Sequence, residues 1–284
     1  MYNLCYVINK NYIGVFKVSI LSLLKNNKEK YLIHMLSNDL DEFDKLNLSN
    51  FLKEFNTEIK YYQIDDNIFK NLPKMGYDNS YTAYYKVLIP YILKDLDNCL
   101  YLDCDIIVKN GLKEIFELNH NHFLSASSDL RLNKKRKEHK KLIIGDDTIT
   151  YFNSGVMYFD YKYKDEIPDI NKLLDYLVSN KEDIIFHDQD ILNHFFAKNY
   201  DLLDEKYNYA TTYKDISDML LKKGLKKAVV IHFANWKPWN EDYIGKAYRL
   251  YKKYYKMLKY DKDVSFLKKR KLIKMIKKIL KYLR

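Results

Sequence analysis

The stretch YLDCDIIV, residues 101–108, decides the fold class, because it is an apolar run broken only by two carboxylates. Together with the preceding NCL it predicts one continuous buried strand, of the kind found in parallel sheets that are covered on both faces. Residues i and i+2 of a strand point to the same face, so Asp103 and Asp105 should converge while Cys104 points away. Converging buried carboxylates are costly unless a cation or a proton compensates them.

Strands and helices alternate on both sides of this stretch. Apolar runs predict further strands at 4–8, 31–38, 58–64, 122–128, 151–160 and 226–233. Apolar residues at helical spacing predict helices at 12–27, 41–56, 80–93 and 169–180, and residues 131–141 form a basic loop. This alternation indicates an α/β sheet whose functional site lies at the carboxyl ends of the strands. Neither GxGxxG nor GxxxxGK[ST] occurs, which disfavours a dinucleotide fold and a P-loop NTPase.

The charge of the chain is concentrated in its last residues. The net charge is +11, and residues 268–284 alone carry nine basic and no acidic side chains, which leaves the rest nearly neutral. Three cysteines without a CxxC pair disfavour a disulfide framework or a cysteine zinc site. The first residues lack the features of a signal peptide, and no run of 18 apolar residues occurs, so we expect a cytoplasmic protein.

The pattern DxD occurs five times, but only Asp103/Asp105 lies in a strongly apolar run. Carboxylate oxygens suit Mn²⁺ or Mg²⁺, which commonly bridge to the phosphates of a substrate. The alternative is a buried structural pair neutralised by a lysine, and this stretch alone does not decide between the two. A phosphatase of the haloacid-dehalogenase type, with Asp103 as nucleophile, is a third interpretation. It is disfavoured because that motif usually opens its domain and precedes a Gly-Thr turn.

A second informative stretch is VVIHFANWKPW, residues 229–239, in which His232 ends an apolar strand and Lys237 follows in a compact turn. A histidine there is often only held by a backbone carbonyl, and a loop lysine is usually only solvated. An imidazole is nevertheless a common metal ligand, and a lysine pairs well with a phosphate.

The stretches YLDCDIIV, FNSGVMYFD, HDQDILN and HFANWKPW, in this order and spacing, resemble glycosyltransferase family 8 over residues 3–240. The resemblance implies a GT-A fold: a mixed central sheet with helices on both faces, here plus a basic C-terminal helical tail. It also implies a retaining enzyme that uses Mn²⁺, or Mg²⁺, to move galactose or glucose from a UDP-sugar. The saccharide acceptor would belong to a cell-surface glycan or glycoprotein, as in bacterial lipopolysaccharide biosynthesis.

The resemblance also assigns roles to residues. Asp103, Asp105 and His232 would bind the metal. Of the two catalytic candidates, Gln189 would stand beside the anomeric carbon and Asp188 would hold a hydroxyl group of the transferred sugar. The donor-binding residues would be Asn9, Asn11, Tyr12, Lys86, Asp103, Cys104, Asp105, Asp129, Asn153, Asp188 and Lys237. Because Gln189 is a poor nucleophile, we expect a front-face reaction, with a double displacement on Asp188 as the alternative.

Three positions depart from the family pattern. Lys86 stands where the family usually has an arginine, so a bidentate contact is lost. Asn9 replaces an aspartate of the nucleoside loop, and HFANWKPW is one residue shorter than the family motif and lacks its glycine. A protein that binds UDP-sugars without efficient catalysis is therefore an alternative function.

The tail, residues 268–284, places apolar residues on one helical face with lysines opposite. Basic amphipathic helices of this kind bind membrane surfaces, so we expect peripheral attachment to the inner face of the membrane. A nucleic-acid tail and a helix packed on the domain are the rivals, but base-reading motifs are lacking. The expected division is a catalytic domain at 1–240 and a helical region at 241–284.

Overall fold

The computed structural model describes residues 1–74, 80–211, 224–234, 237–239 and 247–264. Contacts between residues group the chain into two compact units, each built from several segments. The first unit comprises Met1–Asn9, Glu29–Asp103 and Lys113–Glu205. The second unit comprises Lys10–Lys28, Cys104–Leu112 and the described residues after Glu205.

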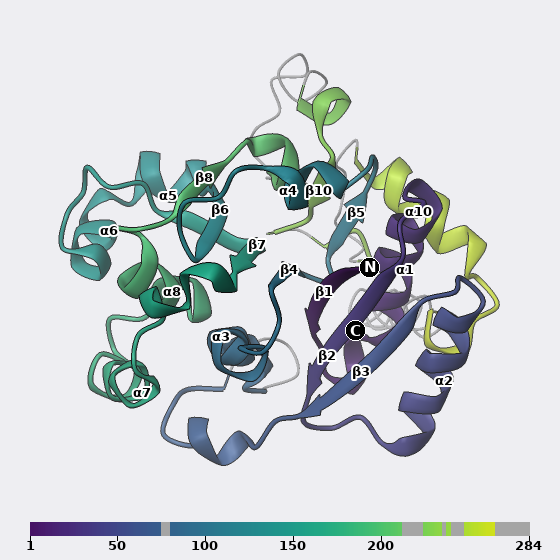
Figure 1. Ribbon diagram of the computed structural model, residues 1–284, viewed down its shortest axis with the longest axis horizontal. Coiled ribbons are helices and arrows are strands. Elements are labelled where there is room, and N and C mark those ends of the chain that lie inside the picture. Colours follow the sequence, from purple (N-terminus) through teal and green to yellow (C-terminus); the bar gives the residue numbers. More distant parts are fainter. Residues whose placement is uncertain (75–79, 212–223, 235–236, 240–246, 265–284) are drawn as a thin grey trace, which may run out of the picture. The chain divides into compact units, whose positions relative to one another are not determined.

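The first unit contains a seven-stranded sheet with the order β3-β2-β1-β4-β7-β6-β8 (Figure 1). The strands are β1 (Tyr2–Val7), β2 (Tyr31–Ser37), β3 (Glu58–Gln63), β4 (Asn98–Leu102), β6 (Leu124–Ser128), β7 (Phe152–Asp160) and β8 (Asp201–Leu203). Strands β3, β2, β1 and β4 run parallel, whereas β7 is antiparallel to both β4 and β6. The mixed central sheet expected from the sequence is confirmed.

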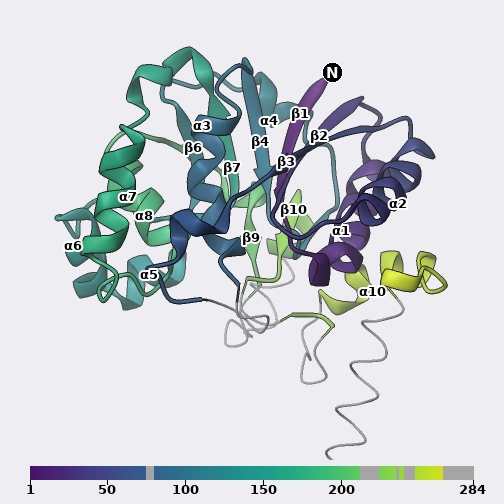
Figure 2. The same ribbon diagram turned by 90° about the horizontal axis from the view of Figure 1, so that it is seen from below.

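Helices of the first unit follow most of these strands (Figures 1 and 2). They are α2 (Glu42–Lys53), α3 (Ile89–Ile92), α4 (Lys113–Glu117), α5 (Leu130–Lys135), α6 (Lys137–Ile144), α7 (Ile170–Ser179) and α8 (Asp188–Phe196), with 3-10 turns η2 (Asp66–Phe69), η3 (Thr82–Leu88) and η4 (Tyr161–Glu166). Helix α2 begins at a capping box, in which the side chains of Asp41 and Asp44 each accept from the other's backbone N–H. Helix α7 turns its apolar residues Leu173 and Leu177 into the core.

The second unit contains a three-stranded sheet with the order β5-β10-β9, formed by β5 (Ile106–Val108), β10 (Val230–His232) and β9 (Tyr209–Ala210). Its helices are α1 (Ile13–Asn26) and α10 (Tyr248–Met257), and η1 (Lys10–Tyr12) precedes α1; η5 (Glu205–Tyr207) begins at the boundary of the units. Helix α1 is joined to β5, because Val108 N donates to Ser22 Oγ at 2.8 Å and Val108 O accepts from Asn26 Nδ2 at 2.9 Å.

The prediction of one continuous strand at 98–108 is wrong. Strand β4 ends at Leu102 and β5 begins at Ile106, and the two strands belong to different sheets. The backbone changes partners within three residues, because Asp103 N donates to Gly155 O at 2.8 Å whereas Asp105 O accepts from Phe233 N at 2.9 Å. Asp103 and Asp105 therefore lie in a connection between strands, not on one face of a strand.

Two further predictions need correction. The basic stretch 131–141 is mostly helical, because Asp129 caps α5 by accepting from Arg131 N and Leu132 N, and α6 buries Ile143 and Ile144. The stretch 80–93 is mainly the 3-10 turn η3 followed by the single turn of α3. Local capping and burial decide these cases, whereas the periodicity of apolar residues alone does not distinguish the two helix types.

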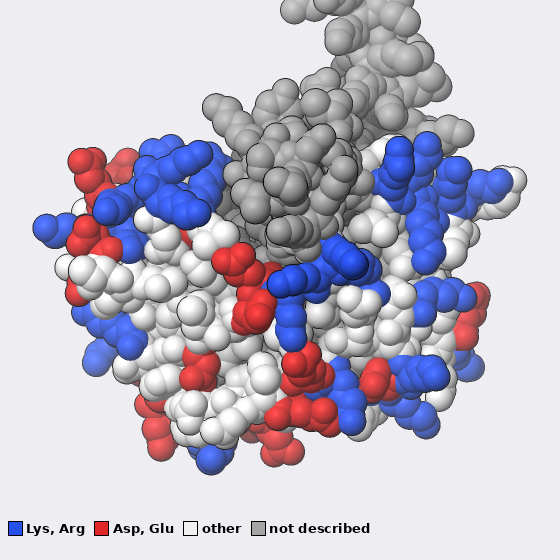
Figure 3. Space-filling view, turned by 90° about the horizontal axis from the view of Figure 1, so that it is seen from above, with Lys and Arg blue, Asp and Glu red and all other residues white. Residues whose placement is uncertain are grey.

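Basic and acidic side chains are interspersed on the face drawn in Figure 3, as the nearly neutral charge of residues 1–267 leads one to expect. Among the described residues, no helix combines the length and the apolar character that crossing a membrane requires. The predicted tail at 268–284 lies outside the described residues.

Candidate active site

Lys86 joins two carboxylates of the first unit. Its Nζ lies 2.9 Å from Asp103 Oδ1 and 3.0 Å from Asp188 Oδ2, and the lysine is only 9% exposed. Burial lowers the pKa of Lys86, but the charges of the two carboxylates outweigh burial and hold it above its usual value. Burial raises the pKa of Asp188 although Lys86 opposes this shift. The lysine thus compensates the buried Asp188 and the half-buried Asp103 at once.

Two hydroxyl groups complete this arrangement. Tyr101, whose ring lies in the core, donates from its OH to Asp103 Oδ1 at 2.5 Å. Ser154 Oγ donates to Asp188 Oδ2 at 2.7 Å. Because each acid is held by a lysine and a hydroxyl group, the positions of both carboxylates are set before any ligand arrives.

Gln189 lies at the centre of a second set of polar contacts in the same unit. Its Oε1 accepts from Asn153 Nδ2 at 2.9 Å and from Ser154 N at 3.1 Å. Its Nε2 donates to Asp129 Oδ2 at 3.1 Å. The start of α8, the start of β7 and the turn after β6 therefore present their polar side chains to one another.

Asp105 is the focus of the polar contacts in the second unit. His232 Nε2 lies 3.2 Å from Asp105 Oδ1, and Lys237 Nζ contacts Asp105 Oδ2. Lys237 also donates to the backbone oxygens of Phe233 at 2.9 Å and Ala234 at 3.2 Å, which orients its side chain. Burial raises the pKa of Asp105, but the charges of Lys237 and His232 outweigh burial and hold it well below its usual range.

The His232 ring is oriented by Asn208. Its Nδ1 lies 2.9 Å from Asn208 Oδ1, an acceptor, so Nδ1 donates to Asn208 and Nε2 is directed at Asp105. Metal-bound histidines in proteins are commonly held in this way by a second hydrogen bond.

Asp103 precedes Asp105 by two residues, and one ligand atom from each of Asp103, Asp105 and His232 lies within 4.8 Å of the others. Two carboxylate oxygens and one imidazole nitrogen form a donor set that suits Mn²⁺ and, less well, Mg²⁺. The oriented Nε2 and this donor set fit a divalent metal ion.

A model of glycosyl transferase family 8 matches residues 3–243 of this sequence. The chain belongs to glycosyl transferase family 8. Over 253 residues it is 32% identical to a lipopolysaccharide 1,2-glucosyltransferase of Escherichia coli, which covers 84% of this chain and 74% of the relative. Over 249 residues it is 28% identical to a lipopolysaccharide 1,3-galactosyltransferase of Salmonella typhimurium, and this match covers 84% of this chain and 73% of the relative.

Solved structures show the same fold. The galactosyltransferase LgtC in complex with donor and acceptor sugar analogs matches this family 8 chain with a TM-score of 0.74 at 23% identity. The match covers 89% of this chain and 94% of that protein, which identifies the fold as GT-A. The family and the fold expected from the four sequence stretches are confirmed.

The remaining predicted site residues of this family 8 chain lie as follows. Asn9 is buried and its amide lies 3.3 Å from Thr82 Oγ1, so it ties the end of β1 to η3. Asn11 is exposed, and the Tyr12 ring meets Trp239 edge-on with centroids 6.5 Å apart. Cys104 is buried and forms no disulfide. Their roles toward a nucleotide stay predictions.

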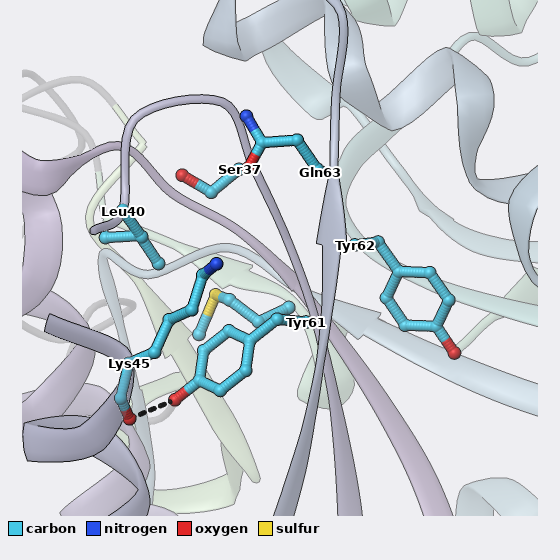
Figure 4. Close-up of a pocket in the computed structure, with 7 residues that line it drawn as sticks. Ser37, Leu40, Lys45, Tyr61, Tyr62 and Gln63 are labelled. Carbon is cyan, nitrogen blue, oxygen red and sulfur yellow. Dashed lines mark hydrogen bonds between the residues drawn. The ribbon is translucent and has the colours of Figure 1, made fainter. Parts of the chain in front are cut away.

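The motifs in the sequence did not predict roles for Tyr101, Ser154 and Asn208. Ser154 lies inside a stretch that was recognised, and Tyr101 lies two residues before Asp103, so both were within reach of the sequence. Asn208 had no such signal, because its contact with His232 joins residues 24 positions apart. A separate pocket lies beside β2 and β3, where Tyr61 OH donates to Lys45 O at 2.8 Å (Figure 4). None of the predicted site residues lines this pocket.

Proposed function

We propose that this chain is a retaining hexosyltransferase that moves galactose or glucose from a UDP-sugar to a saccharide acceptor of a cell-surface glycan. The observation that carries the proposal is the cluster of Asp103, Asp105 and His232 in a family 8 chain, with Lys237 on Asp105. The names of its relatives, lipopolysaccharide glucosyltransferase and galactosyltransferase, favour a lipopolysaccharide-like acceptor and a hexose donor.

A divalent ion held by these three residues would act as a Lewis acid on the diphosphate of the donor. Lys237, held by two backbone oxygens, would pair with a diphosphate oxygen and stabilise the charge that develops on it. Asp188 and Asp129 would accept hydrogen bonds from hydroxyl groups of the transferred sugar, and Lys86 would keep Asp188 in place.

The reaction would proceed on one face of the sugar. An acceptor hydroxyl oxygen bonds to the anomeric carbon while the bond from that carbon to the diphosphate breaks, and the hydroxyl proton passes to the departing phosphate oxygen. Gln189 is a neutral amide already bonded to Asn153 and Asp129, so it orients polar groups and does not serve as a nucleophile.

We further propose that residues 1–240 form the catalytic domain and that residues 241–284 end in a segment that binds the inner face of the membrane. The nine basic and no acidic side chains at 268–284 support this proposal, because anionic headgroups attract such a segment.

A donor screen tests the proposed function. The full chain is incubated with Mn²⁺ and a panel of UDP-hexoses, and released UDP is measured with and without EDTA. We expect metal-dependent UDP release from UDP-galactose or UDP-glucose. Tight binding of UDP-sugars without any release would instead support an impaired binding protein, and covalent phosphorylation of Asp103 would support the phosphatase interpretation.

A further inference from the structure

Asp190 is completely buried in the first turn of α8, and four donors surround its carboxylate. Its Oδ1 accepts from His139 Nε2 at 2.8 Å and from Tyr151 OH at 2.6 Å. Its Oδ2 accepts from the backbone N–H groups of Ile185 at 2.8 Å and Phe186 at 2.7 Å. A carboxylate with this many donors is fixed in position, and neither oxygen is available for attack on a sugar.

The two backbone contacts of Asp190 hold a strained turn. His187 follows Phe186 directly and has φ 51° and ψ −121°, a conformation that non-glycine residues rarely adopt. The turn is closed further by Gln189 N, which donates to Phe186 O at 3.0 Å. Such strain persists only where the surrounding contacts enforce it, and Asp190 supplies two of these contacts.

This turn leads directly into the two residues that carry the predicted chemistry. Asp188 and Gln189 come next in the chain, and their side chains reach Lys86 and Asn153 respectively. A change in the turn would therefore move both side chains relative to the polar groups of β7 and η3.

We infer that His139, through Asp190, is a positioning residue for Asp188 and Gln189. Helices α6 and α8 are neighbours (Figures 1 and 2), and His139 lies on α6, outside the four motifs that define the family. Its imidazole and the hydroxyl of Tyr151 together hold one oxygen of Asp190, which leaves the other oxygen directed at the turn. The expected loss of reaction rate rests on the proposed function. The expected displacement of Asp188 and Gln189 does not depend on that function.

His194 provides a matched control. It also bridges the same two helices, because it lies on α8 and its Nδ1 donates to Ile143 O of α6 at 2.8 Å. It does not belong to the set of donors around Asp190. Loss of general packing between α6 and α8 should affect the variants His139→Leu and His194→Leu alike, whereas loss of positioning should affect only His139→Leu.

The kinetic experiment measures hydrolysis of the UDP-sugar that the wild-type protein accepts. We expect His139→Leu to lower kcat by roughly 10- to 100-fold with little change in KM, because a small displacement of reacting groups has such effects. His194→Leu should keep the wild-type kcat. His139→Gln, which keeps an N–H donor, should recover most of the activity. Equal losses in the two leucine variants would overturn the inference.

A second experiment does not depend on activity. The chain contains only two glutamines, Gln63 and Gln189, so labelling with ¹⁵N-glutamine gives two side-chain amide pairs. Gln63 on β3 donates to Asn38 O and serves as the internal reference. We expect the Gln189 pair to shift in His139→Leu and to stay unchanged in His194→Leu. An unmoved Gln189 pair in His139→Leu contradicts the inference even if no donor is turned over, whereas inactivity of the wild-type protein bears only on the proposed function.

Discussion

Lys86 Nζ lies 2.9 Å from Asp103 Oδ1, so the first carboxylate of the DxD pair is matched by a lysine from the 3-10 turn η3. The second carboxylate, Asp105, is matched in the same way by Lys237. Of the two interpretations that the sequence left open, the lysine-neutralised pair is present, and the same two carboxylates also belong to a donor set that fits a metal ion. The lysines balance the charge of the acids, and His232 adds the nitrogen that a purely structural ion pair does not need.

Replacing Lys86 should separate its role from that of an ordinary buried lysine. We expect Lys86→Met to lower UDP release on the order of 100-fold, because Asp103 and Asp188 lose their shared cation. Lys86→Arg should stay within about ten-fold of wild type, since the cation is kept. Lys17, which is 1% exposed and paired with Asp261 and Asp263, is the control. Lys17→Met should lower the melting temperature but spare activity in the protein that remains folded.

Asn208 should control metal affinity without contacting the metal. We expect Asn208→Ala to raise the Mn²⁺ concentration for half-maximal activity by roughly 10- to 100-fold, because His232 loses the acceptor that orients its ring. Asn110→Ala, which removes only a contact with Ala228 O in the same unit, should leave this concentration unchanged. A normal Mn²⁺ titration of Asn208→Ala would show that Asn208 does not orient the ligand.

The front-face reaction predicts unequal effects at two positions. Gln189→Ala should keep substantial activity, because the amide only orients neighbouring groups. Asp105→Ala should abolish UDP release, because a metal ligand and the partner of Lys237 are lost. A glycosyl adduct found on the protein by mass spectrometry, or near-complete loss in Gln189→Ala, would count against this route.

His34 should make the fold sensitive to acid. Burial, with a smaller effect of Lys60, lowers its pKa from 6.5 to about 4. Between these two pH values the unfolded chain binds a proton at His34 more readily than the folded chain does. The stabilisation of the folded state by neutral His34 is therefore complete above pH 6.5 and is lost as the pH falls toward 4. Between pH 8 and pH 5 the free energy of unfolding should fall by about 2 kcal/mol.

Urea unfolding at several pH values measures this effect. His34→Gln lacks the titrating imidazole, so its free energy of unfolding should depend less on pH in this window. Parallel pH profiles for the two proteins would rule out His34 as the source.

The anchoring of residues 261–264 decides where the tail can be removed. Lys17 Nζ donates to Asp263 Oδ2 at 2.7 Å, and Val264 is fully buried. A Cβ on Gly14 would come within 2.4 Å of Asp263 O. We expect a chain that ends at Val264 to fold normally and to lose binding to anionic vesicles in a co-sedimentation assay. Equal vesicle binding by the full chain and the shortened chain would refute attachment through the tail.

The sequence was sufficient for the family and for the types of groups in the candidate site. The resemblance carried by four short motifs in order groups Asp103, Asp105, His232 and Lys237 as a set, although more than a hundred residues separate the first pair from the second. The alternation of strands and helices likewise predicts an α/β sheet, and the family resemblance adds that the sheet is mixed. Each motif and each strand or helix signal is local in the chain, so it can be read without knowing which distant segments meet.

Other features depended on distant partners. Residues 98–108 have strand-forming side chains throughout, yet the backbone leaves one sheet after Leu102 and enters another at Ile106, because different strands offer the hydrogen bonds. The partners of Lys86, the Asn208 contact that orients His232 and the four donors around Asp190 arise in the same way. The sequence by itself thus determined which chemical groups are available, whereas the tertiary structure alone decided which of them meet, since such contacts require the packing of segments that are far apart in the chain.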